Sequence, residues 1–260
     1  MAYVHGHVCL LKMIMMNQSI CILLIISFSL VFTLEDNLTQ GKKIYNQSCV
    51  ACHGLSGKGD GVVAGNLMVK PRDFTDGKFK VRTTSSGQVP TDEDLYRILS
   101  KGMGHDNSMP TWANLRSDEK EAVVQYIKTF APKKFARQGR VTVLTIPPRN
   151  ASTWESIAQG RQWYNDMECS KCHGLGGHAD GPSTPTLKDS WGNKIVPPDL
   201  SKPWLFIGGS EPEDVYRSLW TGLTGSAMPA VEGTLTEDQT WDLVNFLIHQ
   251  FISPGENAPR

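Results

Sequence analysis

The chain has little of what several common functions require. Its formal net charge is zero, with 26 Lys and Arg against 26 Asp and Glu, and no concentrated basic stretch is interleaved with aromatic residues. That composition argues against nucleic-acid binding. No Ser-His-Asp set and no pair of catalytic carboxylates stands out. Gly-rich stretches such as GLSGKGDG lack the strand-to-helix context of a phosphate-binding loop. Hydrolytic and nucleotide-dependent functions are therefore poor candidates.

Cysteine is also scarce, and four of the six residues stand in two copies of one motif, C-x-x-C-H: Cys49-Val50-Ala51-Cys52-His53 and Cys169-Ser170-Lys171-Cys172-His173. This is the attachment sequence of a c-type haem, in which two thiols add to two vinyl groups of one porphyrin. A zinc site made of the two Cys pairs would leave both adjacent histidines unexplained. The sequence predicts two covalently bound haem c groups, attached through Cys49, Cys52, Cys169 and Cys172, with the irons bound by His53 and His173.

A Met-Pro pair follows each motif at nearly the same distance. Met109 lies 56 residues after His53, and Met228 lies 55 residues after His173. A Met in a helical protein is usually core filler, but the matched positions predict Met109 and Met228 as the second iron ligands. His/Met ligation raises the potential and is typical of electron-transfer cytochromes. Near Met109, the alternatives are Met68, Met103 and His105, and His105 would lower the potential of the first haem.

The N-terminus carries a targeting or anchoring segment. Residues 18–34 (QSICILLIISFSLVFTL) form an apolar run that is preceded by Lys12 and ended by Glu35-Asp36, and the two remaining cysteines, Cys9 and Cys21, lie in this region. The run is long for a signal peptide and slightly short for a bilayer-spanning helix. Residues 1–36 are therefore predicted to be a cleaved signal peptide or an inner-membrane anchor. Both alternatives place the rest of the chain in the bacterial periplasm.

An internal repeat divides the remainder into two units. Residues 41–61 match residues 160–181, PRDF (71–74) matches PPDL (197–200), and EDLYRILSKG (93–102) matches EDVYRSLWTG (213–222). The predicted organisation is a first domain over 37–131, an extended basic linker over 132–151 and a second domain over 152–260. The linker is identified by its Lys, Arg and Pro content.

Helix signals dominate both units. Helices are expected over 38–48 and from about Thr153. Others are expected after the N-cap patterns Thr91-x-x-Asp94 and Ser210-x-x-Glu213. Closing helices are expected after Ser117 and Thr236, where apolar residues recur at helical spacing. The segments between them have few strand signals. The fold class predicted is all-α, with long loops around a large apolar cofactor.

Each unit resembles a class I cytochrome c domain, and the whole resembles a dihaem cytochrome c of the bacterial periplasm. The resemblance covers residues ~38–130 and ~152–251. It implies that the first and last helices of each unit cross, with Gly41 and Tyr45 against Tyr126 in the first unit and Gly160 and Tyr164 against Phe246 in the second. It also implies a loop carbonyl beside each iron-binding histidine, for which Pro182 is the candidate in the second domain and Val62 stands at the matching position in the first. Candidate partners of the haem propionates are Arg72, Arg82, Lys101, Trp112, Trp191, Lys194 and Trp204, whereas His178 and His249 are expected at the surface.

These features predict an electron carrier without catalysis of its own, which transfers single electrons between redox protein partners in the periplasm or membrane. One alternative is a membrane-anchored subunit of a respiratory oxidoreductase complex. Another is an enzyme similar to dihaem peroxidases, but those need an open iron, and both units carry a Met-Pro pair. Residues 1–149 hold 19 Lys and Arg against 12 Asp and Glu, and residues 150–260 hold 7 against 14. This asymmetry indicates either two ordinary solvated surfaces or a basic half that docks an acidic partner.

Overall fold

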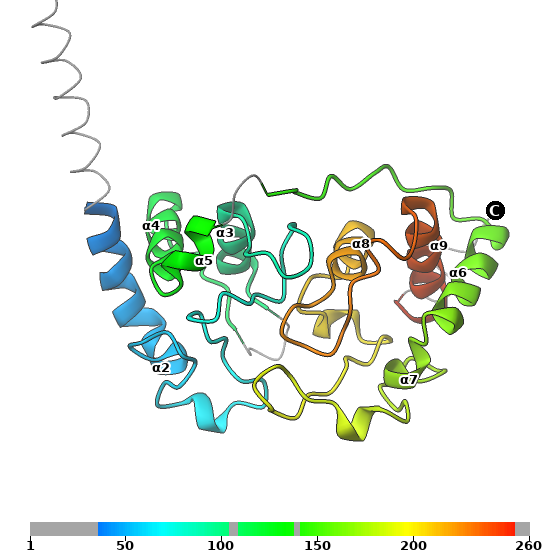
Figure 1. The fold of residues 1–260 in the computed structure, drawn as a ribbon, viewed down its shortest axis with the longest axis horizontal. Helices are drawn as coiled ribbons and strands as arrows, with labels where there is room; N and C mark the ends of the chain where they lie inside the picture. The colour runs from blue at the N-terminus through cyan, green and yellow to red at the C-terminus, as the bar shows by residue number, and fades with distance from the viewer. Residues whose placement is uncertain (1–35, 104–108, 138–140, 253–260) are drawn as a thin grey trace, which may run out of the picture.

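The computed structural model describes residues 36–103, 109–137 and 141–252, and it shows two helical halves of the same design side by side (Figure 1). Residues 1–35, which include the apolar run, and His105 lie outside the described part. Across the described ranges there are isolated β-bridges but no strand, so the all-α prediction is confirmed. Within these same ranges, no helix is both long and apolar enough to cross a membrane. The first half contains a helix over 36–48, α2 (Val50–His53), the 3-10 turn η1 (Ala64–Asn66), α3 (Asp92–Lys101) and α4 (Ser117–Lys128).

The second half repeats this order after the connecting segment. Its helices α6 and α7 correspond to the helix over 36–48 and to α2, and its helices α8 and α9 correspond to α3 and α4. The π-helical turn η4 extends α9. The elements of this half are α6 (Trp154–Asp166), α7 (Ser170–His173), η2 (Thr184–Thr186), η3 (Pro203–Leu205), α8 (Pro212–Thr221), α9 (Glu237–Leu247) and η4 (Ile248–Ile252).

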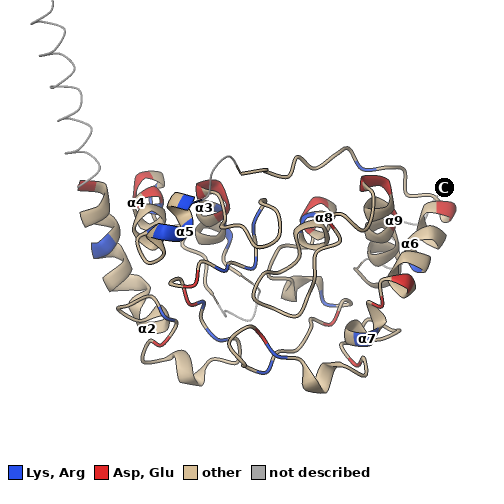
Figure 2. Cartoon of the chain, viewed as in Figure 1, with Lys and Arg blue, Asp and Glu red and all other residues tan. Residues whose placement is uncertain are grey.

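Side-chain caps fix several helix starts where the sequence predicts them. The Thr91 hydroxyl accepts the Asp94 N–H at 3.1 Å, and the Asp94 carboxylate accepts the Thr91 N–H at 3.0 Å, at the start of α3. Thr236 and Gln239 make the same reciprocal pair at α9. Carboxylates also occupy the first turns of α3, α4, α8 and α9 (Figure 2), where the helix dipole favours negative charge.

Two predicted helix starts are wrong by one residue. Helix α8 begins at Pro212 with Glu211 as its N-cap, and no side chain caps it, so Ser210 is not the cap. Proline causes the shift, because its fixed φ and missing N–H suit the first helical position. Helix α4 begins at Ser117 itself, and Arg116 is its N-cap.

Each half is closed by a crossing of its first and last helices. A Cβ atom placed on Gly41 would overlap with the Ala122 carbonyl in α4, and one placed on Gly160 would overlap with the Asp242 carbonyl in α9. Tyr45 packs against Tyr126 with 5.3 Å between ring centroids. Tyr164 packs against Phe246 at 5.5 Å. The crossings implied by the resemblance are therefore present in both halves, and each depends on a glycine that lets two backbones touch.

The apolar cores are separate, one in each half. In the first half, α3 and α4 pack together, and in the second, α9 packs against both α6 and α8. The buried residues of the first core are Ile44, Tyr45, Phe74, Phe79, Leu95, Leu99, Val123, Val124 and Ile127. The second core contains Ile157, Tyr164, Leu200, Val215, Tyr216, Leu219, Val231, Leu235, Trp241, Leu243, Val244, Phe246, Leu247, Ile248 and Phe251.

The sequence predicts an extended connecting segment, but the segment is not extended throughout. It starts with the short helix α5 (Pro132–Arg137), in which Pro132 occupies the first position. Phe135 holds this helix against the first core, with its ring centroid 6.2 Å from that of Phe79. Further along, Leu144 N–H donates to Thr83 O at 2.7 Å, and the Pro147 carbonyl accepts from the Trp241 indole at 3.2 Å. The segment therefore contacts both halves along its course.

Arg82 joins the two halves directly. Its side chain has no exposed surface, and its guanidinium donates to Thr221 O at 2.6 Å and to Gly222 O at 3.4 Å, both in the second half. It also donates to Ser85 O at 3.3 Å in its own half. Burial lowers the Arg82 pKa to about 10, so the side chain is still charged at neutral pH. A buried cation that satisfies carbonyls on both sides is a specific interdomain contact.

Replacing Arg82 by Leu is expected to uncouple the halves. The change removes the guanidinium donor to the buried Thr221 carbonyl and leaves the Gly222 carbonyl with only the Thr221 hydroxyl among its described donors, which costs about 3 kcal/mol. Chemical unfolding followed by fluorescence and by haem absorbance should separate into two transitions. The control is Arg116→Leu, because the Arg116 side chain is exposed and its ion pair with Asp118 lies at the surface; this variant should unfold as the unmodified chain does. A single unshifted transition in Arg82→Leu would contradict the assignment.

Candidate haem sites

Both C-x-x-C-H motifs fold as one helical turn, α2 and α7, directly after the first helix of each half (Figure 1). Their four cysteines are free thiols. Burial raises the pKa of both Cys49 and Cys169 to about 11, so these groups are protonated at neutral pH. The two pairs belong to different halves, and no three His, Cys, Asp or Glu side chains converge anywhere in the described ranges. A zinc site shared by the two Cys pairs is therefore not formed.

A tyrosine of the first helix fixes the chain just after each motif. The Tyr45 hydroxyl donates to the Gly54 carbonyl at 2.7 Å, and the Tyr164 hydroxyl donates to the Gly174 carbonyl, also at 2.7 Å. Both glycines have a positive φ, 74° and 79°, which favours glycine. Sequence reasoning used these tyrosines only for helix packing. Their nearly equal offsets, four residues before Cys49 and five before Cys169, were the signal that they also position the histidine turn.

Each motif histidine, predicted to bind iron, lies beside the carbonyl of a distant loop. His53 Nδ1 is 3.2 Å from Arg72 O. His173 Nδ1 has no hydrogen bond of standard geometry within the described residues. The Pro198 carbonyl is nevertheless near enough to raise the pKa of this imidazole. In both histidines burial lowers the pKa, and the carbonyl partly opposes that effect. Both imidazoles are therefore kept neutral, which is the form that binds a metal ion.

The prediction that Pro182 supplies the carbonyl beside His173 is wrong. Arg72 and Pro198 occupy matching positions in PRDF and PPDL. Equivalent hydrogen bonds bring these two segments to the motif loops, since Phe74 N–H donates to Gly57 O and Leu200 N–H donates to Gly177 O, each at 2.7 Å. The chain around Pro182 instead returns to the motif helix, where Ser183 N–H donates to Lys171 O at 2.8 Å.

The two Met-Pro segments are built in the same way. Met103 N–H donates to Met109 O at 2.9 Å, and Leu223 N–H donates to Met228 O at 3.2 Å. Beyond each methionine the chain bonds back to the preceding helix, through Trp112 N–H to Leu99 O at 2.8 Å and through Val231 N–H to Leu219 O at 3.0 Å. Met109 and Met228 each pack partly buried against the core of their own half.

Within the described residues, Met68 and the two histidines expected at the surface can be placed. Met68 is 98% exposed, so it faces solvent and not the core. His178 is exposed and lies 3.3 Å from Asp199, as expected of a surface residue. His249 is half-buried and packs edge-on against Trp154, with ring centroids 5.1 Å apart, so the expectation of a surface position holds only in part. The assignment of His105 falls outside the described part of the chain.

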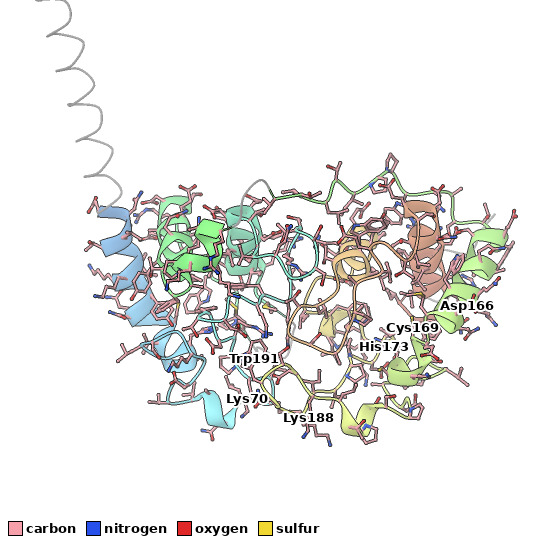
Figure 3. The ribbon with its side chains drawn as sticks, in the orientation of Figure 1. Lys70, Asp166, Cys169, His173, Lys188 and Trp191 are labelled. Carbon is pink, nitrogen blue, oxygen red and sulfur yellow. The ribbon has the colours of Figure 1, made fainter. Side chains whose placement is uncertain are left out.

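Cationic side chains gather around Trp191, which lies where loops of the two halves meet (Figure 3). The Arg72 guanidinium lies 4.3 Å from the centre of the Trp191 ring, and the Lys78 ammonium lies 5.5 Å from it. Burial lowers the Arg72 pKa to about 10, and burial together with the Arg72 charge lowers the Lys80 pKa to about 8. Among the described residues neither Arg72 nor Lys80 makes an ion pair. Half-buried cations of this kind fit the carboxylates of a haem, whereas the fully buried Arg82 does not, since the carbonyls around it engage its nitrogens.

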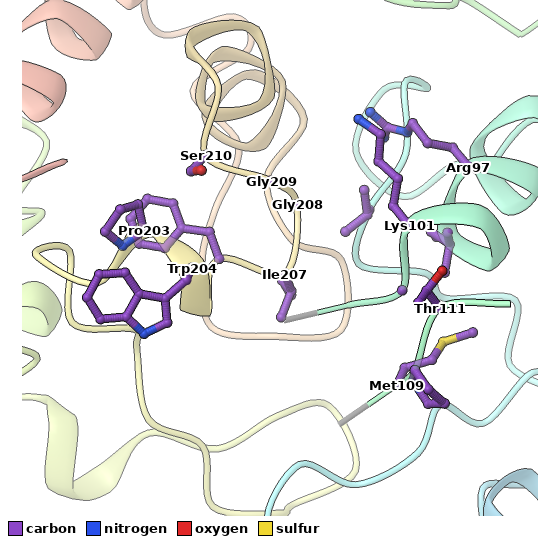
Figure 4. A pocket seen from close by; sticks show the side chains of 15 residues that line it. Arg97, Lys101, Met109, Thr111, Pro203, Trp204, Ile207, Gly208, Gly209 and Ser210 are labelled. Atoms are coloured by element: carbon purple, nitrogen blue, oxygen red, sulfur yellow. The ribbon is translucent and has the colours of Figure 1, made fainter. Parts of the chain in front are cut away.

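A second meeting point of the halves is a cavity of about 280 Å³ (Figure 4). Met109, Lys101 and Arg97 line it from the first half, and Trp204 and Ile207 line it from the second. Of the predicted propionate partners, Lys101 and Trp204 thus face this cavity. Lys194 is exposed, and Trp112 packs against the first core.

The residues present fit a covalently bound haem in each half. Each half offers two cysteines that form no disulfide, a half-buried neutral imidazole with a carbonyl beside it, and a methionine on an anchored loop. Near the first site there are also half-buried cations that make no ion pair among the described residues. An apolar, dianionic porphyrin would satisfy all of these groups.

The fold and the sites define a protein of two tandem class I cytochrome c domains. The chain belongs to the family described as cytochrome c oxidase, cbb3-type, subunit III, whose profile matches residues 36–127 and 155–247. It is also similar to a solved chain titled as part of a reducing HAO-like protein complex of Kuenenia stuttgartiensis. That match has 36% identity, a TM-score of 0.77, and covers 81% of this chain and 95% of the other. A comparison with curated proteins finds no match. The chain is therefore a c-type cytochrome with bound haem c and a role in electron transfer.

Proposed function

We propose that the protein binds two haem c groups, one in each domain, and passes single electrons between protein partners. The supporting observation is that both domains build the same site, down to the tyrosine, the loop carbonyl and the anchored methionine segment. When bound, each haem iron alternates between its ferrous and ferric states and so accepts or releases one electron. A site with two protein ligands has no open position for peroxide, which disfavours a peroxidase.

Each group in the site has a separate role in this proposal. Cys49 and Cys52 attach the first haem, Cys169 and Cys172 attach the second, and His53 and His173 bind the two irons. The Arg72 carbonyl orients the His53 imidazole, because a hydrogen bond at Nδ1 fixes the ring and leaves Nε2 for the metal. The Pro198 carbonyl occupies the matching position beside His173. Met109 and Met228 complete the coordination from segments that bond back to α3 and α8. The motif loops and the Met-Pro segments, both anchored by backbone hydrogen bonds, would hold these side chains in place during electron transfer.

Replacing Met109 or Met228 by Ala should remove the sulfur ligand from one iron only. Each single variant is expected to lose half of the near-infrared ferric charge-transfer absorbance of a Met-bound haem, and the double variant all of it. The potential of the altered haem should fall, since Met ligation raises it. Spectroelectrochemical titration measures both effects. Met68→Ala is the control, because this exposed side chain should change neither. An unchanged spectrum in Met109→Ala would identify a different ligand in domain 1.

We further propose that the chain works on the periplasmic side as part of a respiratory oxidoreductase assembly, with residues 1–36 as signal or anchor. The family description and the similar chain from a redox protein complex support an assembly. Native purification of the full chain from membranes and from the periplasmic fraction tests this. A membrane complex with a second redox subunit is the expected result. A free monomer beginning near residue 37 would contradict the assembly, and peroxide-dependent oxidation of a reduced donor would favour the peroxidase.

A further inference from the structure

One face of domain 1 exposes apolar side chains around the short turn η1. Val62 and Val63 precede the turn and are 90% and 37% exposed, and Met68 and Val69 follow it and are 98% and 38% exposed. Leu55, next to the motif, is 74% exposed. We call these five residues the η1 patch. Single exposed apolar residues are normal, but several together on one short segment mark an interaction surface.

The matching face of domain 2 is less apolar. The repeat aligns without gaps through η1 and η2, so Val62 and Val63 correspond to Pro182 and Ser183. Beyond η2 the second domain has six extra residues before PPDL, and its exposed apolar residues on these segments are Leu175, at 83%, and Val196, at 64%. The turns η1 and η2 themselves have the same length and the same offset from the motif. The backbone therefore does not require apolar residues at these positions, and their presence in domain 1 needs another reason.

The η1 patch lies against the proposed attachment site of the first haem. Gly61 N–H donates to Cys52 O at 3.1 Å, and Val63 N–H donates to Ala51 O at 3.0 Å. The turn η1 packs on α2, which carries Cys52 and His53. A protein seated on the patch would be close to that haem, and a short distance is what electron transfer between proteins requires.

Positive charge borders the η1 patch. Lys70 is held beside it, because its ammonium donates to Ala64 O at 3.2 Å and to Gly65 O at 2.9 Å at η1. Lys58 is exposed on the preceding loop. Asp60 is the one carboxylate in residues 55–70, so the segment has a net charge of +1, while residues 175–190 hold one Lys and two Asp. An apolar centre with a basic rim is complementary to an apolar surface bordered by carboxylates.

We propose that the η1 patch, and not the matching face of domain 2, docks a redox protein whose contact surface is apolar with an acidic rim. This inference rests on the proposed electron-transfer function. The similar chain from a redox protein complex also favours a protein as the occupant. Electrons exchanged with this partner pass through domain 1.

The test exchanges the patch for the residues of the other domain. The triple variant Val63→Ser, Met68→Lys, Val69→Asp takes the residues found at the same distances from the motif histidine in domain 2, and its net charge equals that of the unmodified chain. The holoprotein is reduced and mixed by stopped flow with oxidised plastocyanin, an acidic redox protein, or with ferricyanide. Leu175→Ser is the matched control on domain 2. Haem spectra and circular dichroism of all variants check the fold.

The triple variant is expected to react about tenfold more slowly with plastocyanin, because loss of apolar contacts at a docking centre costs more than about 1 kcal/mol. Its rate with ferricyanide should stay within about twofold of that of the unmodified chain, and Leu175→Ser should change neither rate. Equal plastocyanin rates in the triple variant and the unmodified chain would overturn the inference. So would stronger binding of the unmodified chain than of the triple variant to anionic lipid vesicles. No oxidation by ferricyanide in any form would instead refute the electron-transfer function.

Discussion

A chain in which Ser replaces both Cys49 and Cys52 is expected to keep only half of its covalent haem. The two motifs belong to separate domains with separate cores, so the second site should mature without the first. Domain 1 would lose the cofactor that fills its centre, and the apolar surface left in water makes it the less stable half by several kcal/mol. A pyridine haemochrome assay, with mass spectrometry of the intact chain, counts the haems directly.

The mirrored variant, Cys169→Ser with Cys172→Ser, is the control for this experiment. It should also retain one haem per chain, and peptide mapping should place that haem on the first motif. Loss of both haems in either variant would show that the domains mature as one unit. Retention of both would mean that attachment does not depend on these thiols.

Replacing Gly160 by Ala should destabilise domain 2 by about 3 kcal/mol, since overpacking of a tight contact costs up to this amount. The added Cβ would overlap with the Asp242 carbonyl of α9 and press on Phe246. Backbone cannot yield as a flexible side chain can, so α6 and α9 must separate. Chemical unfolding of the holoprotein, followed at the second haem, measures the loss.

Gly65→Ala is the matched control, because no atom lies within 4 Å of the Cβ position at Gly65. Its stability should equal or slightly exceed that of the unmodified chain, since alanine restricts the unfolded state. Gly41→Ala should reproduce the effect of Gly160→Ala in domain 1. Equal stability of Gly160→Ala and Gly65→Ala would show that the crossing tolerates separation.

The sequence predicted the features that depend on local spacing. The caps at Thr91 and Thr236 follow from short-range hydrogen bonding, and the helix crossings at Gly41 and Gly160 follow from the resemblance. The carbonyl beside His173 could not be assigned correctly, because a long loop carries Pro198 back to the motif and its path depends on tertiary contacts. The role of Arg82 was missed for a similar reason, since its acceptors at Thr221 and Gly222 lie about 140 residues away.

The helix crossings also constrain the timing of maturation. In both domains the closing helix begins 64 residues after the motif histidine, at Ser117 and at Glu237. Because a chain is synthesised from its N-terminus, each motif emerges before its closing helix does. Once the crossing forms, Cys49 and Cys169 pack partly buried against the closed cores of their domains, so a cofactor reaches these thiols less readily. We expect covalent attachment of haem to be fastest before the closing helix packs. A domain that folds before haem arrives would then remain without it.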